Sequence, residues 1–198
     1  TISGLFAAGD VAGGAPKKYV SGAWVEAKIA VRTAIDEIAD IELLHVSDDE
    51  VNREKERIAR CINGREGLSH EELERILHET MDEYAGGATA HYELTESKLI
   101  IARDKLKKLE AKLQYLRAED NHELVSCLEL IDRFDVAKVL IEHLISRQET
   151  RWPAYQTRTD YPERDDNNWL GFVNSIYDPV NDRVKIVKRA LNETLCNI

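Results

Sequence analysis

The feature that most limits what this chain can fold into is the long stretch from Ser47 to Gln148, which contains no proline. Proline inside a helix removes a hydrogen bond and clashes with the preceding turn, so its absence permits long helices. Within the stretch, apolar and charged residues alternate at helical spacing. The sequence therefore predicts a bundle of three to four helices over residues 47–149.

Local signals mark the ends of the first two helices in this stretch. One of the acids at 48–49 is placed to cap a helix that runs to Ile62, where a glycine-containing turn stops it. Ser69 and Glu72 have the spacing of a capping box. This box predicts a second helix that ends before the glycine pair at 86–87.

The third and fourth helices are defined by the spacing of their apolar residues. In the third, these residues recur in alternating steps of three and four, which is typical of a narrow seam against a partner helix. The seam comprises Leu99, Ala102, Leu106, Leu109, Leu113 and Leu116. The fourth helix is predicted to begin near Asp120–Asn121. Its predicted buried residues include Leu124, Leu128, Ile131, Phe134, Val139, Leu140 and Leu144.

The composition changes after Thr150 and predicts an extended tail over residues 150–198. Segment 151–166 is rich in arginine, acids, aromatics and proline and has no period. Short strands are predicted at Trp169–Ser175 and Val184–Val187, with a turn between them.

The charged side chains of the tail allow two interpretations. The six residues concerned are Arg151, Arg158, Arg164, Asp160, Asp165 and Asp166. The set is either a substrate site or an ion-pair lattice that docks the tail, and we favour docking. The predicted buried anchors of the tail are Trp152, Tyr155, Tyr161 and Trp169.

The first residues of the chain have a different character. An apolar run at 5–8 predicts a strand, which leads into Gly9–Asp10 and a glycine-rich loop. A helix is predicted from Ser21, as its N-cap, to about Leu44. An acid, glycines and the start of a helix are the features of a dinucleotide-binding site. A strand–turn–helix in any α/β protein has a similar pattern. Because the chain opens directly on an apolar run without methionine, we expect a fragment of a longer protein.

Charge and cysteine content argue against several classes of protein. The net charge is −10 and the isoelectric point is near 5.1, which argues against a nucleic-acid partner. No apolar run approaches the roughly 20 residues that span a bilayer, and no leader pattern is recognised. A cytoplasmic protein without direct membrane insertion is therefore expected. Neither the three cysteines nor the histidines have metal-ligand spacing, so no metal site is predicted.

Two distant motifs carry a resemblance to a known family. Residues 4–11, Gly-Leu-Phe-Ala-Ala-Gly-Asp-Val, followed by 21–23, Ser-Gly-Ala, resemble the second FAD-binding motif of the succinate dehydrogenase and fumarate reductase flavoprotein family. Residues 149–152 and 160–169 resemble the C-terminal signature of the same family. Within the family, the tail looks most like that of adenylylsulfate reductase alpha subunits.

The resemblance implies part of an FAD-dependent oxidoreductase that exchanges electrons between a small anionic substrate and an iron–sulfur subunit. It implies that Asp10, beside Gly9, holds the ribityl hydroxyls of FAD. It also implies that Ser21, Gly22 and Ala23 face the flavin.

The glycine-rich loop departs from the family pattern. Where a His-Lys pair is expected, this chain has Lys17 and Lys18. Lys17 is interpreted as a catalytic-site cation that binds an anionic substrate, or else as a solvated loop lysine. The arginine and glycine pattern that binds dicarboxylates is not recognisable between Gly13 and Gly22. The substrate therefore stays open between adenylyl sulfate with sulfite and a dicarboxylate.

The expected fold is mainly α. It consists of a strand–loop–helix remnant of an FAD-binding domain at 1–46, the helical bundle at 47–149 and the irregular tail with short strands at 150–198. No Gly-x-Gly-x-x-Gly turn for the FAD pyrophosphate occurs, so the chain alone is expected to bind FAD poorly and to be inactive. The alternative is a free-standing helical interaction domain whose leucine seam recruits a partner helix. Membrane association, if any, is expected to be peripheral and through a partner.

Overall fold

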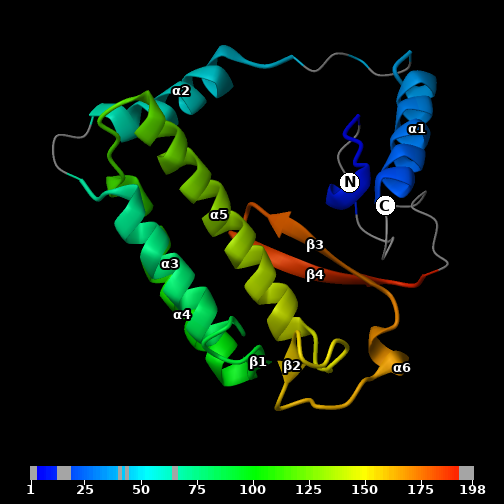
Figure 1. Ribbon diagram of the computed structural model, residues 1–198. Helices are drawn as coiled ribbons and strands as arrows, with labels where there is room; N and C mark the ends of the chain where they lie inside the picture. Colours follow the sequence, from blue (N-terminus) through cyan, green and yellow to red (C-terminus); the bar gives the residue numbers. More distant parts are fainter. Residues whose placement is uncertain (1–3, 13–18, 40–41, 43–44, 64–66, 192–198) are drawn as a thin grey trace. The chain divides into compact units, whose positions relative to one another are not determined.

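The computed structural model describes residues 4–12, 19–39, 42, 45–63 and 67–191 (Figure 1). The chain divides into two compact units, and the larger one is formed by Asp48–Asn192. The smaller unit contains the described residues before Asp48. Each unit is described by itself below.

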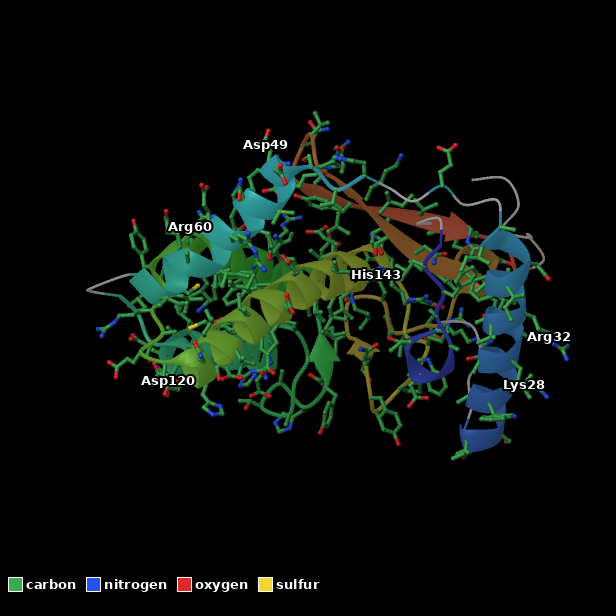
Figure 2. The ribbon with its side chains drawn as sticks, turned by 90° about the horizontal axis from the view of Figure 1, so that it is seen from above. Lys28, Arg32, Asp49, Arg60, Asp120 and His143 are labelled. Carbon is green, nitrogen blue, oxygen red and sulfur yellow. The ribbon has the colours of Figure 1, made fainter. Side chains whose placement is uncertain are left out.

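The smaller unit contains a short 3₁₀ helix, η1 (Gly9–Val11), and one long helix, α1 (Tyr19–Glu37). The predicted strand at 5–8 is wrong, because these residues pair with no other strand among the described residues. An extended segment without a neighbouring strand has no ladder of hydrogen bonds to define it. Lys28 and Arg32, one turn apart, project from the same side of α1 (Figure 2).

Helix α1 begins and ends earlier than the sequence predicts. Ser21 lies within its first turn instead of capping it, and the helix stops at Glu37, well before the predicted end near Leu44. Two acids, Asp36 and Glu37, occupy the last turn, which holds no basic residue. Negative charge at the C-terminal end opposes the helix dipole, so these acids weaken the last turn and do not explain why the helix ends there.

The larger unit is built on four long helices, which confirms the mainly helical fold (Figure 1). They are α2 (Asp48–Asn63), α3 (His70–Tyr84), α4 (Glu96–Glu110) and α5 (Asn121–Ser146). Ser69 caps its helix as predicted, and the fourth helix starts where the sequence places it, with Asp120 as its cap. The Ser69 hydroxyl accepts a hydrogen bond from the Glu72 N–H at 3.4 Å. The Asp120 carboxylate accepts from the N–H groups of His122 and Glu123 at 2.8 and 2.9 Å.

The leucine seam of α4 forms the centre of the bundle. Leu99, Ala102, Leu106 and Leu109 are buried, and they pack with side chains of α3 and α5. The helix ends at Glu110 and not at Leu116, because the chain tightens into i→i+3 hydrogen bonds that lead into η2 (Leu113–Tyr115). Since the seam is filled within this chain, its leucines are not available to recruit a partner helix.

Helix α5 buries Phe134 and Leu144 as predicted, but the rest of its buried stripe differs from the prediction. The buried residues are Cys127, Leu130, Phe134, Ala137, Ile141 and Leu144. Leu140, which was predicted to be buried, is 41% exposed because it lies beside this stripe. Cys127 and Cys61 are buried free thiols, and burial raises the pKa of Cys127 to about 11. At that pKa, the Cys127 thiol is protonated and unreactive near neutral pH.

The described part of the tail adds four short elements to the bundle, and the first of them pairs in parallel with a strand that precedes α4. Strand β1 (Glu93–Leu94) pairs with β2 (Thr157–Arg158). Helix α6 (Asp166–Trp169) follows. The predicted tail strands form an antiparallel hairpin, β3 (Phe172–Asp178) with β4 (Arg183–Arg189).

Trp169 lies in α6 and not in the predicted first strand of the tail. Asp165 explains the difference, because its carboxylate accepts from the Asn168 N–H and starts a helical turn. Among the described residues, no helix is long and apolar enough to cross a membrane.

Candidate functional site

The glycine of the Gly-Asp motif joins η1 to α1. Gly9 is buried, has a φ of +74° and donates its N–H to Glu26 on α1 at 2.8 Å. A Cβ atom built on Gly9 would lie 3.5 Å from the Cβ of Ala23. The left-handed φ favours glycine, and the hydrogen bond to Glu26 holds the turn against the first half of α1.

The structure gathers some of the predicted site residues and separates others. Gly9 and Ala23 lie together, whereas the Asp10 side chain is exposed. Ser21 is exposed and Gly22 is half-buried in the first turn of α1. Lys17 belongs to residues 13–18, which lie outside the described residues together with Lys18.

Glu26 is a residue of this region that the sequence analysis missed. Its carboxylate accepts from the Gly9 N–H. A signal for it existed, because Glu26 follows Ala23 by three residues and therefore shares its face of α1. Glu26 also helps to line a shallow hollow of about 310 Å³, together with Phe6, Ala7, Ala12, Ile29, Ala30 and Thr33.

Helix α1 has the surface of an element that packs against other structure. Among its described residues none is buried, and Trp24, Ile29 and Ile35 are all more than half exposed. A helix with apolar residues on most sides is typical of the interior of a larger protein. Its exposed apolar surface is therefore a candidate contact surface.

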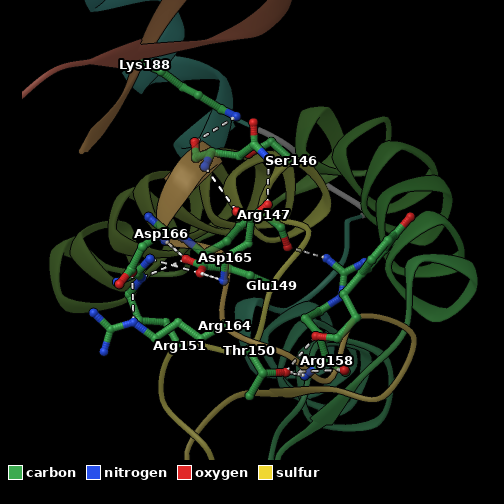
Figure 3. Close-up of polar contacts among 12 residues, drawn as sticks. Ser146, Arg147, Glu149, Thr150, Arg151, Arg158, Arg164, Asp165, Asp166 and Lys188 are labelled. Atoms are coloured by element: carbon green, nitrogen blue, oxygen red, sulfur yellow. Dashed lines mark hydrogen bonds and ion pairs between the residues drawn. The ribbon is translucent and has the colours of Figure 1, made fainter. Parts of the chain in front are cut away.

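A second polar centre lies in the larger unit, around Glu149 (Figure 3). The Glu149 side chain is fully buried, and its carboxylate accepts four hydrogen bonds. The donors are Arg147 at 2.5 Å, Arg151 at 2.6 and 2.9 Å, and the Asp165 N–H at 2.9 Å. Burial would raise the pKa of Glu149, but these hydrogen bonds outweigh it and hold the pKa below its usual value.

Arg158 ties the tail to two helices. Its guanidinium is almost fully buried and donates to the carbonyl oxygens of Leu144 at 2.7 Å and Arg147 at 2.8 Å. Two further N–H groups bind the Asp160 carboxylate at 2.9 Å each. That carboxylate also accepts from the N–H of Glu96, the first residue of α4, at 2.7 Å. The C-terminal end of α5, the start of α4 and the tail thus meet at one ion pair.

The tail therefore contains the ion-pair lattice expected from its charges. Arg151 contacts Glu149 through two nitrogens and Asp166 at 3.0 Å through the third. Every guanidinium nitrogen of Arg158 has a partner as well. Both arginines therefore hold carboxylates within the chain, and this arrangement favours the docking interpretation.

Two of the predicted aromatic anchors are exposed instead of buried. Trp152 is 64% exposed and Tyr155 is 75% exposed, whereas Trp169 is buried beneath Lys188. The reason is a tight turn in which Trp152 accepts from the N–H groups of Tyr155 and Gln156, so that the segment is satisfied without contacting the core. Tyr161 is half-buried, as an anchor should be.

The lattice predicts a pH-dependent effect of Asp160→Asn on thermal stability. The Arg158 hydrogen bond lowers the pKa of Asp160, so the ion pair stabilises the fold fully above the unfolded-state pKa of about 3.9. This contribution is lost as the pH falls through the lower folded-state pKa. The melting temperature of Asp160→Asn should lie below that of the parent above pH 5, and the gap should narrow steadily below pH 4, measured by circular dichroism. A gap independent of pH would contradict it.

The larger unit is a helical bundle with a docked tail, and the smaller unit is a Gly-Asp turn packed on a long helix. Both features are those expected of a flavoprotein subunit, and the comparisons with known proteins give the same family. The family described as the fumarate reductase flavoprotein C-terminal region matches residues 74–197, which is more than half of the chain. The chain belongs to this family.

The individual relatives include two adenylylsulfate reductases. The chain is 29% identical, over 96% of its length, to the alpha subunit of adenylylsulfate reductase from Megalodesulfovibrio gigas, and it covers 31% of that relative. The adenylylsulfate reductase structure from Archaeoglobus fulgidus is 32% identical with a TM-score of 0.88, covering 96% of this chain and 33% of that one. The chain thus spans about a third of the length of these relatives.

Fumarate reductase gives a more distant match. The quinol fumarate reductase of E. coli is 18% identical with a TM-score of 0.69, covering 88% of this chain and 30% of that one. At this level of identity the match shows a shared fold only.

Proposed function

We propose that this chain is the C-terminal part of the flavoprotein subunit of an FAD-dependent oxidoreductase, and that the whole enzyme acts on adenylyl sulfate and sulfite. The observation that carries the proposal is the match to adenylylsulfate reductase over 96% of the chain at a TM-score of 0.88. Fumarate reductase matches at 18% identity, against 32% for adenylylsulfate reductase. A further similar structure is described as an adenosine-5-phosphosulfate reductase with a covalent sulfite adduct.

The smaller unit would supply part of the flavin site. Asp10 is exposed and its carboxylate is able to accept hydrogen bonds from the ribityl hydroxyls. Gly9 holds the turn close to α1, so that Ser21, Gly22 and Ala23 would face the ring from the start of that helix. Bound FAD would supply two-electron chemistry at its ring. Lys17 would bind the anionic substrate beside it.

The electrons would pass between the substrate and an iron–sulfur subunit, and the enzyme would reside in the cytoplasm, at most peripherally associated with a membrane through a partner. The residues of this chain would contribute to electron transfer by positioning the reacting groups and by stabilising their charge. The Glu149 lattice would hold the tail in place, and the exposed apolar side chains of α1 would be covered by the rest of the flavin-binding domain.

The chain alone is proposed to be inactive, because it contains no glycine-rich turn for the FAD pyrophosphate. Titration of the 198-residue chain with FAD in a calorimeter should give no saturable heat. Micromolar binding by the chain would contradict this part of the proposal.

The decisive experiment uses the protein that the whole gene encodes. Its purified form should be yellow, with a flavin spectrum that bleaches on addition of sulfite and AMP and stays unchanged with succinate. Asp10→Ala should lower the flavin content, whereas Asp36→Ala, an exposed acid near the other end of α1, should not. A colourless protein would refute the flavoprotein assignment. A response only to succinate would refute the assignment of adenylyl sulfate and sulfite as substrates.

A further inference from the structure

The hairpin of the tail is a sheet of only two strands. Strand β3 pairs with β4 along its whole length, from Phe172 opposite Arg189 to Asp178 opposite Arg183 (Figure 1). Among the described residues, no backbone hydrogen bond joins β4 to any segment other than β3. A two-stranded sheet is marginally stable by itself, and further strands or a packed helix stabilise it. The outer edge of β4 is therefore a place where a third strand can add.

Strand β4 is strongly basic. It contains four cations and no acid, in a chain whose net charge is −10. The cations are Arg183, Lys185, Lys188 and Arg189. Arg183 lies 3.4 Å from the Asp178 carboxylate, and the side-chain oxygen of Asn174 accepts from Arg189 at 3.0 Å. None of the ion pairs found in the described part of the chain includes the other two cations. The positive charge of β4 is thus largely unmatched by nearby carboxylates.

The side chains of β4 alternate between two faces of different chemistry. One face consists of Val184, Ile186 and Lys188 and is mainly apolar. It is turned towards the rest of the larger unit, because Val184 lies beside side chains of α4 and α5 and Lys188 lies over the ring of Trp169. The opposite face is mainly basic, and its residues are Arg183, Lys185, Val187 and Arg189.

We infer that the outer edge of β4 binds an extended acidic segment of a partner protein, which pairs with β4 as a third strand. The carboxylates of this segment lie beside Arg183 and Lys185, and its apolar side chains lie beside Val184 and Ile186. Main-chain hydrogen bonds give an added strand its affinity, and the side chains on the two faces give its specificity. Opposite charges on neighbouring strands stabilise the pairing further.

The charge of β4 also argues against other occupants of its edge. A second copy of this chain would place basic side chains beside basic side chains, which destabilises strand pairing. Charged residues on edge strands commonly prevent such self-association. The net charge of −10 provides no general attraction for nucleic acid. An acidic protein segment is the occupant that the charges favour.

The test uses the protein that the whole gene encodes and a fluorescein-labelled peptide of alternating glutamate and valine, with binding followed by fluorescence anisotropy. Binding should be saturable and should weaken as salt is added. A peptide of the same composition, with its glutamates and valines in separate blocks, should bind about fivefold more weakly because it cannot match both faces of β4. The alternating peptide methylated at its backbone nitrogens should not bind saturably, because it cannot donate hydrogen bonds to the edge.

A charge reversal on β4 tests the same site from the side of the protein. Lys185→Glu should bind the alternating peptide about fivefold more weakly, because an attractive pair across the strands becomes repulsive. Lys185 is exposed and lies opposite Ile176, so its replacement should leave the hairpin folded. The matched control is Lys108→Glu on α4, an exposed lysine whose reversal should change binding by no more than about twofold. Circular dichroism spectra establish that each variant is folded.

Several outcomes would overturn the inference. Absence of saturable binding would refute it directly. Equal binding of the block peptide or of the methylated peptide would mean that charge alone, and not strand addition, attracts the acidic chain. Equal weakening by Lys185→Glu and Lys108→Glu would remove β4 from the site. Tighter binding to vesicles of anionic lipid, lost in Lys185→Glu, would assign the basic edge to a membrane surface.

Discussion

Replacing Glu149 with glutamine should lower the free energy of unfolding by about 3 kcal/mol, the low end of the cost of breaking a buried ion pair. Arg147 loses its carboxylate partner, whereas Arg151 keeps Asp166. The Glu149 carboxylate is fully buried and is shared by Arg147 and Arg151. Glutamine has nearly the same volume, so the loss reports charge and not packing. Urea unfolding followed by circular dichroism measures the change.

The control for this prediction is Glu79→Gln. Glu79 also binds an arginine, Arg75 at 2.6 Å, but both side chains are about 60% exposed. Exposed pairs of this kind contribute at most about 0.5 kcal/mol. If Glu149→Gln costs no more than Glu79→Gln, the lattice does not hold the tail.

The second large effect is expected for Phe134→Ala. Phe134 is the largest of the fully buried side chains, and it lies at the middle of α5 within the bundle core. Truncating a buried phenylalanine to alanine costs about 3–5 kcal/mol, from lost apolar burial and from the cavity left behind. The same urea unfolding experiment measures it.

Val136→Ala is the matched control on the same helix, because Val136 is 66% exposed. Its effect should stay within about 0.5 kcal/mol, as for most surface substitutions. A small effect of Phe134→Ala, similar to that of Val136→Ala, would mean that α5 does not pack as described. An intermediate effect, between about 1 and 3 kcal/mol, would mean that the site collapses and leaves little cavity.

The parts of the fold that local chemistry determines could be predicted from the sequence. Ser69 was recognised as a cap because a side-chain oxygen before a helix has one obvious set of partners, the first N–H groups. The α4 seam was recognised because a periodic stripe must face another element. These signals lie within a few residues of one another.

Features that depend on distant contacts were missed or misassigned. Leu140 is as apolar as its buried neighbours Ile141 and Leu144. Only the packing of the whole bundle places it beside the buried stripe of α5. Trp152 was taken as an anchor, but a local turn satisfies its segment without burial. Glu149 belonged to a recognised motif, yet nothing near it in sequence shows that it is fully buried.

Among the candidate flavin-binding residues, the motif could be predicted from the sequence but its contacts could not. The Gly9–Asp10 motif was visible in the sequence, and the structure adds that Gly9 packs on Ala23 and binds Glu26. Their roles towards FAD stay predictions, as does the role of Lys17, which lies outside the described residues.

The bond between the Glu96 N–H and Asp160 has a consequence for the order in which the chain folds. The two residues are 64 positions apart. Contacts of such separation form late, because a long loop must close before they stabilise anything. During synthesis, the Glu96 N–H therefore gains this partner only after the tail has left the ribosome. In hydrogen exchange, the amide of Glu96 should gain protection with the tail, after those at the centre of α4.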